Sequence, residues 1–322
     1  MKRVDFFIAG NLKSGTTTYY QLLKQHPEIF VPEYKEPKFF CTDFHKESDD
    51  FHGRRVNYPI RTLEKYQQLF TNGHDNQLFG DCTPHYTYSK EAAENIYKHN
   101  PKAKILIFLR EPVSFLRSLH FDSLHALNEV EKDFIKALEL EDSRRSGENI
   151  PPKISAPSYL FYSDWVKYEE QIRRYVDLFG ADRVKIVFLK QIIKDQESVY
   201  KDILSFLNVK DTNFKPDYSI NKNSSRELRW GFIFKRVKHS KLWNTVGRLL
   251  PVNFYSTLGS IIDKTFFVKA KKDPLPAKKI LTLKKRYLSI VISLNKYLNK
   301  EGLIDFNLLE FWGYEKQIVD ES

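Results

Sequence analysis

One stretch near the N-terminus decides the fold: Val4-Asp-Phe-Phe-Ile-Ala-Gly10-Asn-Leu-Lys13-Ser14-Gly15-Thr16-Thr17-Thr18. Its first part is mostly apolar, which predicts a short buried strand, and the apolar positions that follow the turn predict a helix. A glycine-containing turn between a strand and a helix lets backbone N–H groups converge on an anion at the helix N-terminus. The stretch therefore predicts a phosphate-binding loop, and the alternative is a turn that only caps a helix.

The spacing within this loop is close to that of a nucleotide-binding P-loop. Gly10 and Gly15 are separated by four residues, as in the pattern G-x-x-x-x-G-K-[ST], but Thr16 stands where that pattern has its lysine. The lysine of this loop is Lys13, which can reach a phosphate from inside the loop. Magnesium-dependent phosphoryl transfer fits this departure less well, although a P-loop kinase or NTPase remains the alternative function.

Further along the chain, strand and helix signals alternate. Ile105–Leu109 and Val184–Leu189 are continuous apolar runs, as expected for parallel strands covered on both faces. Helical patterns lie around 91–98, 165–179 and 281–298. We therefore predict an α/β fold, with a P-loop-like central parallel sheet flanked by helices and a helical C-terminal extension. We expect one domain over 1–322, with about 222–322 mostly helical.

The composition indicates in which cellular compartment the protein is expected. The 322 residues are 41% hydrophobic, enough for a sizeable core, and no stretch approaches the roughly 18 to 20 apolar residues that span a membrane. The N-terminus shows no signal-peptide pattern. Cys41 and Cys82 cannot form a disulfide framework and match no zinc motif. We expect a cytoplasmic protein without a metal site.

The positive net charge indicates an anionic ligand or binding partner. The formal net charge is +11, with Lys and Arg concentrated between 222 and 300. Nucleic-acid binding is one alternative, but no zinc motif, helix-turn-helix or RNP-like aromatic pattern is evident. Contact of Leu249–Val268 and the basic stretch after it with a membrane surface is another, and it would add to an enzymatic function rather than replace it.

A second anchor for phosphate follows the strand at 105–109. Arg110 comes directly after that strand, Pro112 suits the first turn of a helix, and Ser118 lies eight residues after Arg110. An arginine is well suited to a phosphate because its planar fork binds two oxygens. Taken singly, the two residues would be read as a strand-end ion pair and a helix-face hydroxyl.

Together these motifs resemble the PAPS-dependent sulfotransferases, which use 3′-phosphoadenosine-5′-phosphosulfate as donor. Lys-Ser-Gly-Thr-Thr-Thr is similar to their 5′-phosphosulfate loop, and the strand, Arg, Pro and Ser are similar to their 3′-phosphate site. The resemblance implies that Lys13 stabilises the leaving phosphate, that PAP is the product, and that no metal is needed. It implies donor contacts from Lys13, Ser14, Gly15, Thr16, Thr17, Thr18, Arg110 and Ser118, and from Arg226 in the loop at 222–226.

The acceptor side resembles the heparan-type and related bacterial sulfotransferases. Lys35-Glu36-Pro37-Lys38-Phe39-Phe40 is similar to their Glu-x-x-Phe-Phe segment, which implies that Glu36 is the general base. Neighbouring aromatic rings can raise the pKa of such a carboxylate, whereas neighbouring lysines lower it. The alternative is a surface glutamate in a loop.

Two departures from that pattern concern the acceptor. Lys38 stands where heparan 3-O-type enzymes have histidine, and in Gly80–Tyr86 Asp81 and Cys82 replace Glu and Lys. The candidate acceptor-binding residues are Lys38, His85 and His120, although His120 also fits a histidine packed inside a helix. The acceptor itself, a hydroxyl or amine of a glycan, lipid or small molecule, stays open, as does the oligomeric state.

Overall fold

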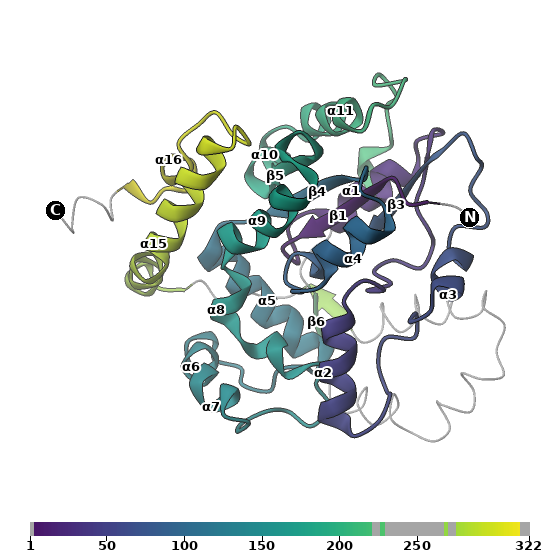
Figure 1. Ribbon diagram of the computed structural model, residues 1–322. Helices are drawn as coiled ribbons and strands as arrows, with labels where there is room; N and C mark the ends of the chain where they lie inside the picture. The colour runs from purple at the N-terminus through teal and green to yellow at the C-terminus, as the bar shows by residue number, and fades with distance from the viewer. Residues whose placement is uncertain (1–2, 221–225, 229–266, 270–274, 316–322) are drawn as a thin grey trace. The chain divides into compact units, whose positions relative to one another are not determined.

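The computed structural model describes residues 3–220, 226–228, 267–269 and 275–315 (Figure 1). The chain forms two compact units, 1–221 with 276–322, and 222–275. In the second unit, β6 (Arg226–Leu228) pairs antiparallel with β7 (Phe267–Lys269). The rest of the predicted nucleotide loop at 222–226 and of the predicted membrane segment at 249–268 lies outside the described residues. The single domain over 1–322 therefore stays a prediction.

The first unit is built on a parallel sheet, as the sequence predicts. Its strands stand in the order β2-β3-β1-β4-β5, and every neighbouring pair is parallel. They are β1 (Phe6–Gly10), β2 (Ile29–Phe30), β3 (Leu78–Cys82), β4 (Lys104–Leu109) and β5 (Val184–Phe188). The sequence predicted β1, β4 and β5 but not the other two. β2 has only two residues, and β3 contains Gly80 and Asp81, types that strands disfavour.

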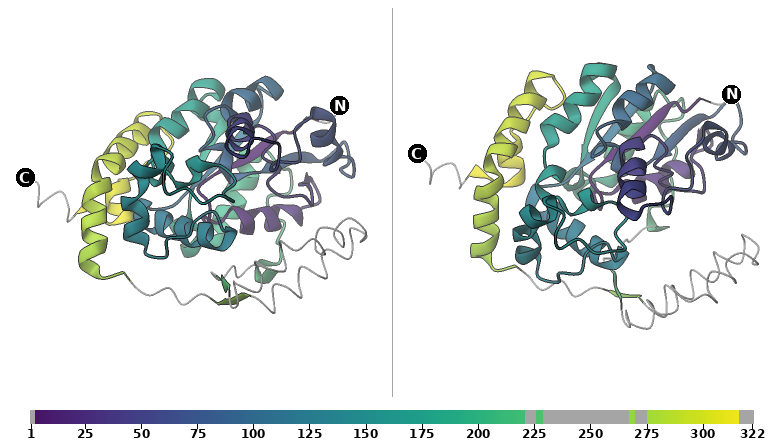
Figure 2. Two further views of the ribbon diagram at one scale, coloured as in Figure 1. Left: turned by 90° about the horizontal axis from the view of Figure 1, so that it is seen from below. Right: turned by 60° about the horizontal axis from the view of Figure 1, so that its bottom comes forward.

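Helices cover both faces of this sheet (Figures 1 and 2). On one face, α1 (Thr16–Lys24) and α11 (Gln196–Leu207) share a buried apolar cluster with Phe6, Ile8, Leu106 and Phe108. On the other face, α4 (Ala92–His99) packs against α9 (Tyr168–Phe179), which also contacts β4 and β5. These layers explain why β1 and β4 read as continuous apolar runs.

The remaining helices surround this core. The predicted helix at 165–179 is interrupted after α8 (Tyr162–Trp165), and the one at 281–298 is part of the longer α15 (Ala277–Lys300). The others are α2 (Thr42–His52), α3 (Leu63–Gln68), α5 (Pro112–Ala126), α6 (Phe134–Glu139), α7 (Glu141–Arg145), α10 (Leu189–Lys194), α15 (Ala277–Lys300) and α16 (Leu308–Trp312), with short 3-10 turns η1 (Pro84–Tyr86), η2 (Pro157–Leu160), η3 (Ala181–Arg183) and η4 (Tyr218–Ile220). Within the described part of the chain, no helix has both the length and the apolar character needed to cross a membrane.

The strand order places the loops of interest at one edge. The chain leaves β1 for β2 and β3 on one side and then crosses to β4 on the other side. The carboxyl ends of β1, β3 and β4 therefore meet where the order reverses, which is where ligands bind in open α/β sheets. The segments after these three strands carry the phosphate-loop residues, His85 and Arg110.

Candidate active site

The loop after β1 turns in a way that depends on glycine. Gly10 has φ 125°, and a Cβ there would overlap the carbonyl oxygen of Phe108 on the neighbouring strand. Gly15 (φ 98°) and Lys13 (φ 61°) also have left-handed backbone conformations. Asn11 ties the loop to the end of β4, because its N–H donates to Phe108 O (2.6 Å) and its Oδ1 accepts from Arg110 N (3.0 Å). The predicted loop conformation is thus held by backbone contacts.

This loop leaves polar groups directed at an anion. The first N–H groups of a helix have no intrahelical acceptor, and at the N-terminus of α1 no side chain among the described residues caps them. Ser14 is completely buried, and its hydroxyl has no hydrogen-bond partner among the described residues. Because buried hydroxyls are nearly always paired, an orphaned one beside an uncapped helix start fits a bound phosphate. Thr16 is also buried, whereas Thr17 and Thr18 are partly exposed.

Arg110 packs against the same loop. Its Nη1 donates to the carbonyl oxygen of Lys13 (3.3 Å), and its own carbonyl accepts from Tyr168 Oη (3.0 Å). Burial lowers the pKa of Arg110 from its ordinary value, which means that this cation lacks full solvation. An anion would restore that lost stabilisation. The two phosphate anchors predicted from sequence therefore meet at one edge of the sheet.

Ser118 belongs to the helix that follows Arg110. Pro112 begins α5, and Glu111 caps it by accepting from the N–H groups of Val113 and Ser114. Ser118 is buried about two turns later. Asp122, one turn beyond Ser118 on the same face, lies against the phosphate loop, so this face of α5 is directed at the loop.

Asp122 is a site residue that the sequence reasoning missed. Its Oδ1 lies 3.6 Å from Lys13 Nζ, and both side chains are about two-fifths exposed, at 41% and 39%. Its charge also raises the pKa of Lys38, against the larger lowering that burial causes. Asp122 thus acts on both Lys13 and Lys38. Its spacing of four residues from Ser118 could have indicated this position.

Glu36 lies in a strained loop between two lysines. It pairs with Lys35, and both Glu36 (φ 59°) and Lys38 (φ 54°) are in the left-handed region. Such strain in residues other than glycine concentrates at functional sites. The ammonium of Lys38 lies 5.8 Å from the ring centres of both Tyr58 and Tyr159. Burial lowers the pKa of Lys38, and Glu36 offsets part of that shift.

His85 stands next to Glu36. Its Nδ1 lies 3.6 Å from Glu36 Oε2, is buried, and has no hydrogen-bond partner among the described residues. Burial holds the pKa of His85 well below its ordinary value, and the charges of Lys38 and Lys35 add to this. The imidazole is therefore neutral at neutral pH and can exchange a hydrogen bond with Glu36 or with an acceptor. Lys38, Glu36 and His85, three of the residues predicted for the site, thus lie in one cluster.

Asp81 and Cys82, which depart from the family pattern, are parts of the core. Asp81 is completely buried and accepts hydrogen bonds from Tyr66 Oη (2.8 Å), Tyr86 Oη (2.7 Å) and Thr83 Oγ1 (2.7 Å). Burial raises the pKa of Asp81 to about 6. The side chain of Cys82 lies in the apolar cluster on the opposite face of the sheet. Neither side chain is free to hold an acceptor.

Of the two remaining predicted site residues, His120 does not join this cluster. His120 is completely buried, and its ring nitrogens contact Tyr162 Oη (3.1 Å) and Lys132 O (3.2 Å). This is the packed histidine of the alternative interpretation, with both nitrogens already engaged. Arg226 begins β6, and its side chain lies outside the described residues.

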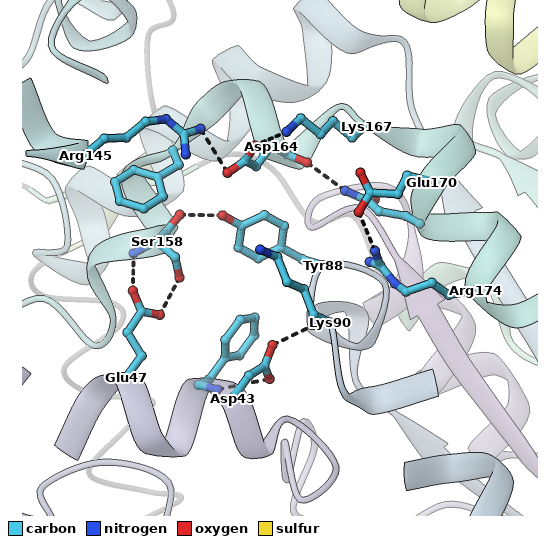
Figure 3. A pocket seen from close by; sticks show the side chains of 13 residues that line it. Asp43, Glu47, Tyr88, Lys90, Arg145, Ser158, Asp164, Lys167, Glu170 and Arg174 are labelled. Atoms are coloured by element: carbon cyan, nitrogen blue, oxygen red, sulfur yellow. Dashed lines mark hydrogen bonds and ion pairs between the residues drawn. The ribbon is translucent and has the colours of Figure 1, made fainter. Parts of the chain in front are cut away.

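A pocket of about 540 Å³ opens between α2 and the segment that contains α8 and α9 (Figure 3). Several of its charged groups pair with one another: Asp164 with Arg145 and Lys167, and Glu170 with Arg174. Phe44 forms part of its wall, and the Phe44 ring contacts that of His85 at 6.4 Å between centres. Neither His85 nor Glu36 is among the residues that line this pocket.

Metal binding is not indicated in the described part of the chain. No group of three or more His, Cys, Asp or Glu side chains is arranged there to hold a metal ion. The expectation of a site without metal stays a prediction.

Comparison with known proteins gives one consistent family. The family model described as "Sulfotransferase family" matches residues 5–213. Among curated relatives, the membrane-associated sulfotransferase kil1 of Dictyostelium discoideum is 21% identical and the heparan sulfate glucosamine 3-O-sulfotransferase 5 of Mus musculus is 24% identical. Each match covers 76% of this chain but only 65% and 64% of the relative, so the chain spans just under two thirds of their length.

A solved structure agrees with these matches. The crystal structure of a sulfotransferase from Alicyclobacillus acidocaldarius is 30% identical, with a TM-score of 0.59. The similarity covers 69% of this chain and 87% of that one. The parallel sheet flanked by helices is therefore the fold that the sequence motifs predicted.

Proposed function

We propose that this chain, which belongs to the sulfotransferase family, moves a sulfuryl group from PAPS to a hydroxyl or amine of an acceptor. One observation carries the proposal: the guanidinium of Arg110 packs on the carbonyl of Lys13, beside an uncapped helix start and the orphaned hydroxyl of Ser14. Two phosphate-binding elements at one edge suit a nucleotide that carries phosphates at both its 5′ and 3′ positions.

The proposed reaction is an in-line displacement at sulfur. The acceptor oxygen or nitrogen forms a bond to sulfur while the bond between sulfur and the 5′-phosphate oxygen breaks, and PAP leaves. Glu36 takes the acceptor proton, and the neutral His85 beside it orients the carboxylate. Lys13 and the first N–H groups of α1 stabilise the negative charge that develops on the leaving phosphate. Arg110 and Ser118 hold the 3′-phosphate and so provide position rather than chemistry.

The proposal also covers the class of the acceptor and the cellular compartment in which the enzyme acts. Because the relative from Mus musculus is named for heparan sulfate, a glycan is the acceptor class to test first, ahead of a lipid or small molecule. The buried thiols of Cys41 and Cys82 are free, which suits a reducing compartment, and we propose that the enzyme acts in the cytoplasm.

Calorimetric titration of the purified chain with PAP and with ADP, without metal, tests this function. We expect preference for PAP, and a loss of about 10- to 100-fold in PAP affinity in Arg110→Ala, as for a hydrogen-bonded charged group. Arg183→Ala, which removes an arginine from η3, is the matched control and keeps wild-type affinity. Equal binding of PAP and ADP, or binding of ATP alone and only with magnesium, would overturn the proposal in favour of a kinase.

A further inference from the structure

The long helix α15 has a one-sided charge composition. Its 24 residues contain seven Lys or Arg and no Asp or Glu. Its apolar residues mostly face inward against α5 and α9, and the buried ones are Leu283, Tyr287, Leu288, Val291, Leu294, Tyr297 and Leu298. Lys284 is partly buried and donates to the carbonyl oxygens of Trp312 and Gly313, whereas the other six basic residues are exposed.

The outer surface of α15 also carries exposed aliphatic side chains. Leu281 and Ile292 are 40% and 44% exposed. They are eleven residues apart, about three helical turns, so they lie on the same side. Lys278 and Lys285 flank Leu281 at spacings of three and four residues, and Lys296 follows Ile292 at four. These five exposed residues are the outer stripe of α15.

Carboxylates on neighbouring elements compensate this helix at a few positions. Asp133, which caps α6, interacts with Lys279, and Glu301 lies 3.5 Å from Lys300. Glu169 on α9 is paired with Arg173 and accepts from Ser293, and the charge of Lys296 also acts on it. The helix itself carries seven cations and no carboxylate, and Lys278, Lys285 and Lys296 present three of these positive charges at exposed positions of the outer stripe.

We propose that the outer stripe of α15 docks reversibly on an anionic lipid surface. Helix geometry gives α15 a length of about 36 Å, so its lysines can contact several headgroups at once. Leu281 and Ile292 favour a lipid surface over a soluble polyanion, because they gain by entering the headgroup region and gain nothing from a fully hydrated chain. Electrostatic attraction contributes most of the binding, since most apolar side chains of α15 are buried inside the protein.

Vesicle sedimentation of the whole chain tests the proposal. We expect binding to phosphatidylcholine vesicles that contain phosphatidylserine, little binding to phosphatidylcholine alone, and release by salt. Each basic residue near such a surface contributes about a factor of five, so the triple variant Lys278→Glu, Lys285→Glu, Lys296→Glu should bind about a hundredfold more weakly. The variant Leu281→Ser, Ile292→Ser keeps the charge and should bind more weakly than wild type.

A matched control separates this surface from net charge. The triple variant Lys65→Glu, Lys102→Glu, Lys210→Glu changes the same number of exposed lysines elsewhere and should bind vesicles nearly as wild type does. Equal losses in both triple variants, or equal binding to both vesicle types, would overturn the proposal. Loss of heparin binding in the α15 variant without any vesicle binding by wild type would instead assign the stripe to an anionic glycan. PAP affinity, measured alongside, reports on folding and is independent of this surface.

Discussion

Replacing Asp122 with asparagine tests how the charge at the donor site is balanced. In the structure its Oδ1 lies 3.6 Å from Nζ of Lys13, the residue proposed to stabilise the leaving phosphate. An incoming phosphate must compete with this carboxylate for the ammonium and is also repelled by it. Asp122→Asn removes both effects while keeping the size of the side chain, so we expect PAP to bind more tightly.

The size of this effect follows from the exposure of the pair. Both side chains are about two-fifths exposed, at 39% and 41%, so solvent screens their interaction. Such pairs contribute about 0.2–1 kcal/mol. Repulsion between a carboxylate and a phosphate about 4 Å apart in water adds up to about 1 kcal/mol. Together these terms, about 0.2–2 kcal/mol, predict about 1.4- to 30-fold tighter binding of PAP, and the gain should shrink as salt is raised.

Calorimetric titration with PAP at two salt concentrations measures this change. Asp182→Asn is the matched control, because Asp182 also lies near a single cation, Arg183, at 3.9 Å, but on η3. Its PAP affinity should equal that of wild type. Weaker PAP binding in Asp122→Asn, or an equal change in the control, would refute the assignment of Asp122 to the donor site.

Three further predictions concern the base and the buried charges. Glu36→Gln should lower kcat about 100- to 10,000-fold with unchanged PAP affinity, and steady-state kinetics with calorimetry would show whether the carboxylate is the base. Because burial raises the pKa of Asp81 from 3.8 to about 6, the folded state binds this proton more tightly than the unfolded chain, so stability should fall as pH rises from about 4 to about 6 and then level off. This loss, about 3 kcal/mol in the free energy of unfolding measured with urea, should be absent in Asp81→Asn. Identical pH profiles of wild type and Asp81→Asn would contradict the prediction. Glu129→Gln breaks the bidentate, almost fully buried pair with Arg144, at 2.8 Å on both sides, and should lower the free energy of unfolding by about 3–5 kcal/mol in the same assay.

Local signals in the chain predicted the loop and the arginine on which the proposed nucleotide site rests. The loop at 10–18 needs glycine where backbone passes close to β4, and Arg110 must follow a buried strand, so both are visible as short motifs. β3 was not visible, because what makes it a strand is its pairing with β1 rather than its own residues. At Gly80 the missing side chain makes room for the Phe6 ring on β1, a contact between residues far apart in sequence.

The acceptor half depended on tertiary structure. A spacing cannot tell whether a polar side chain is used up inside the core, and only the packing shows that Asp81 is held by three hydroxyls while Glu36 faces His85. It also shows that Asp122 reaches Lys13 from another element. The sequence by itself determined the family, the fold class and the phosphate loop, because local backbone geometry requires particular residues at fixed spacings. Which charges meet across elements was decided by the fold, because burial and distance between segments remote in sequence set both the pairing and the pKa of each group.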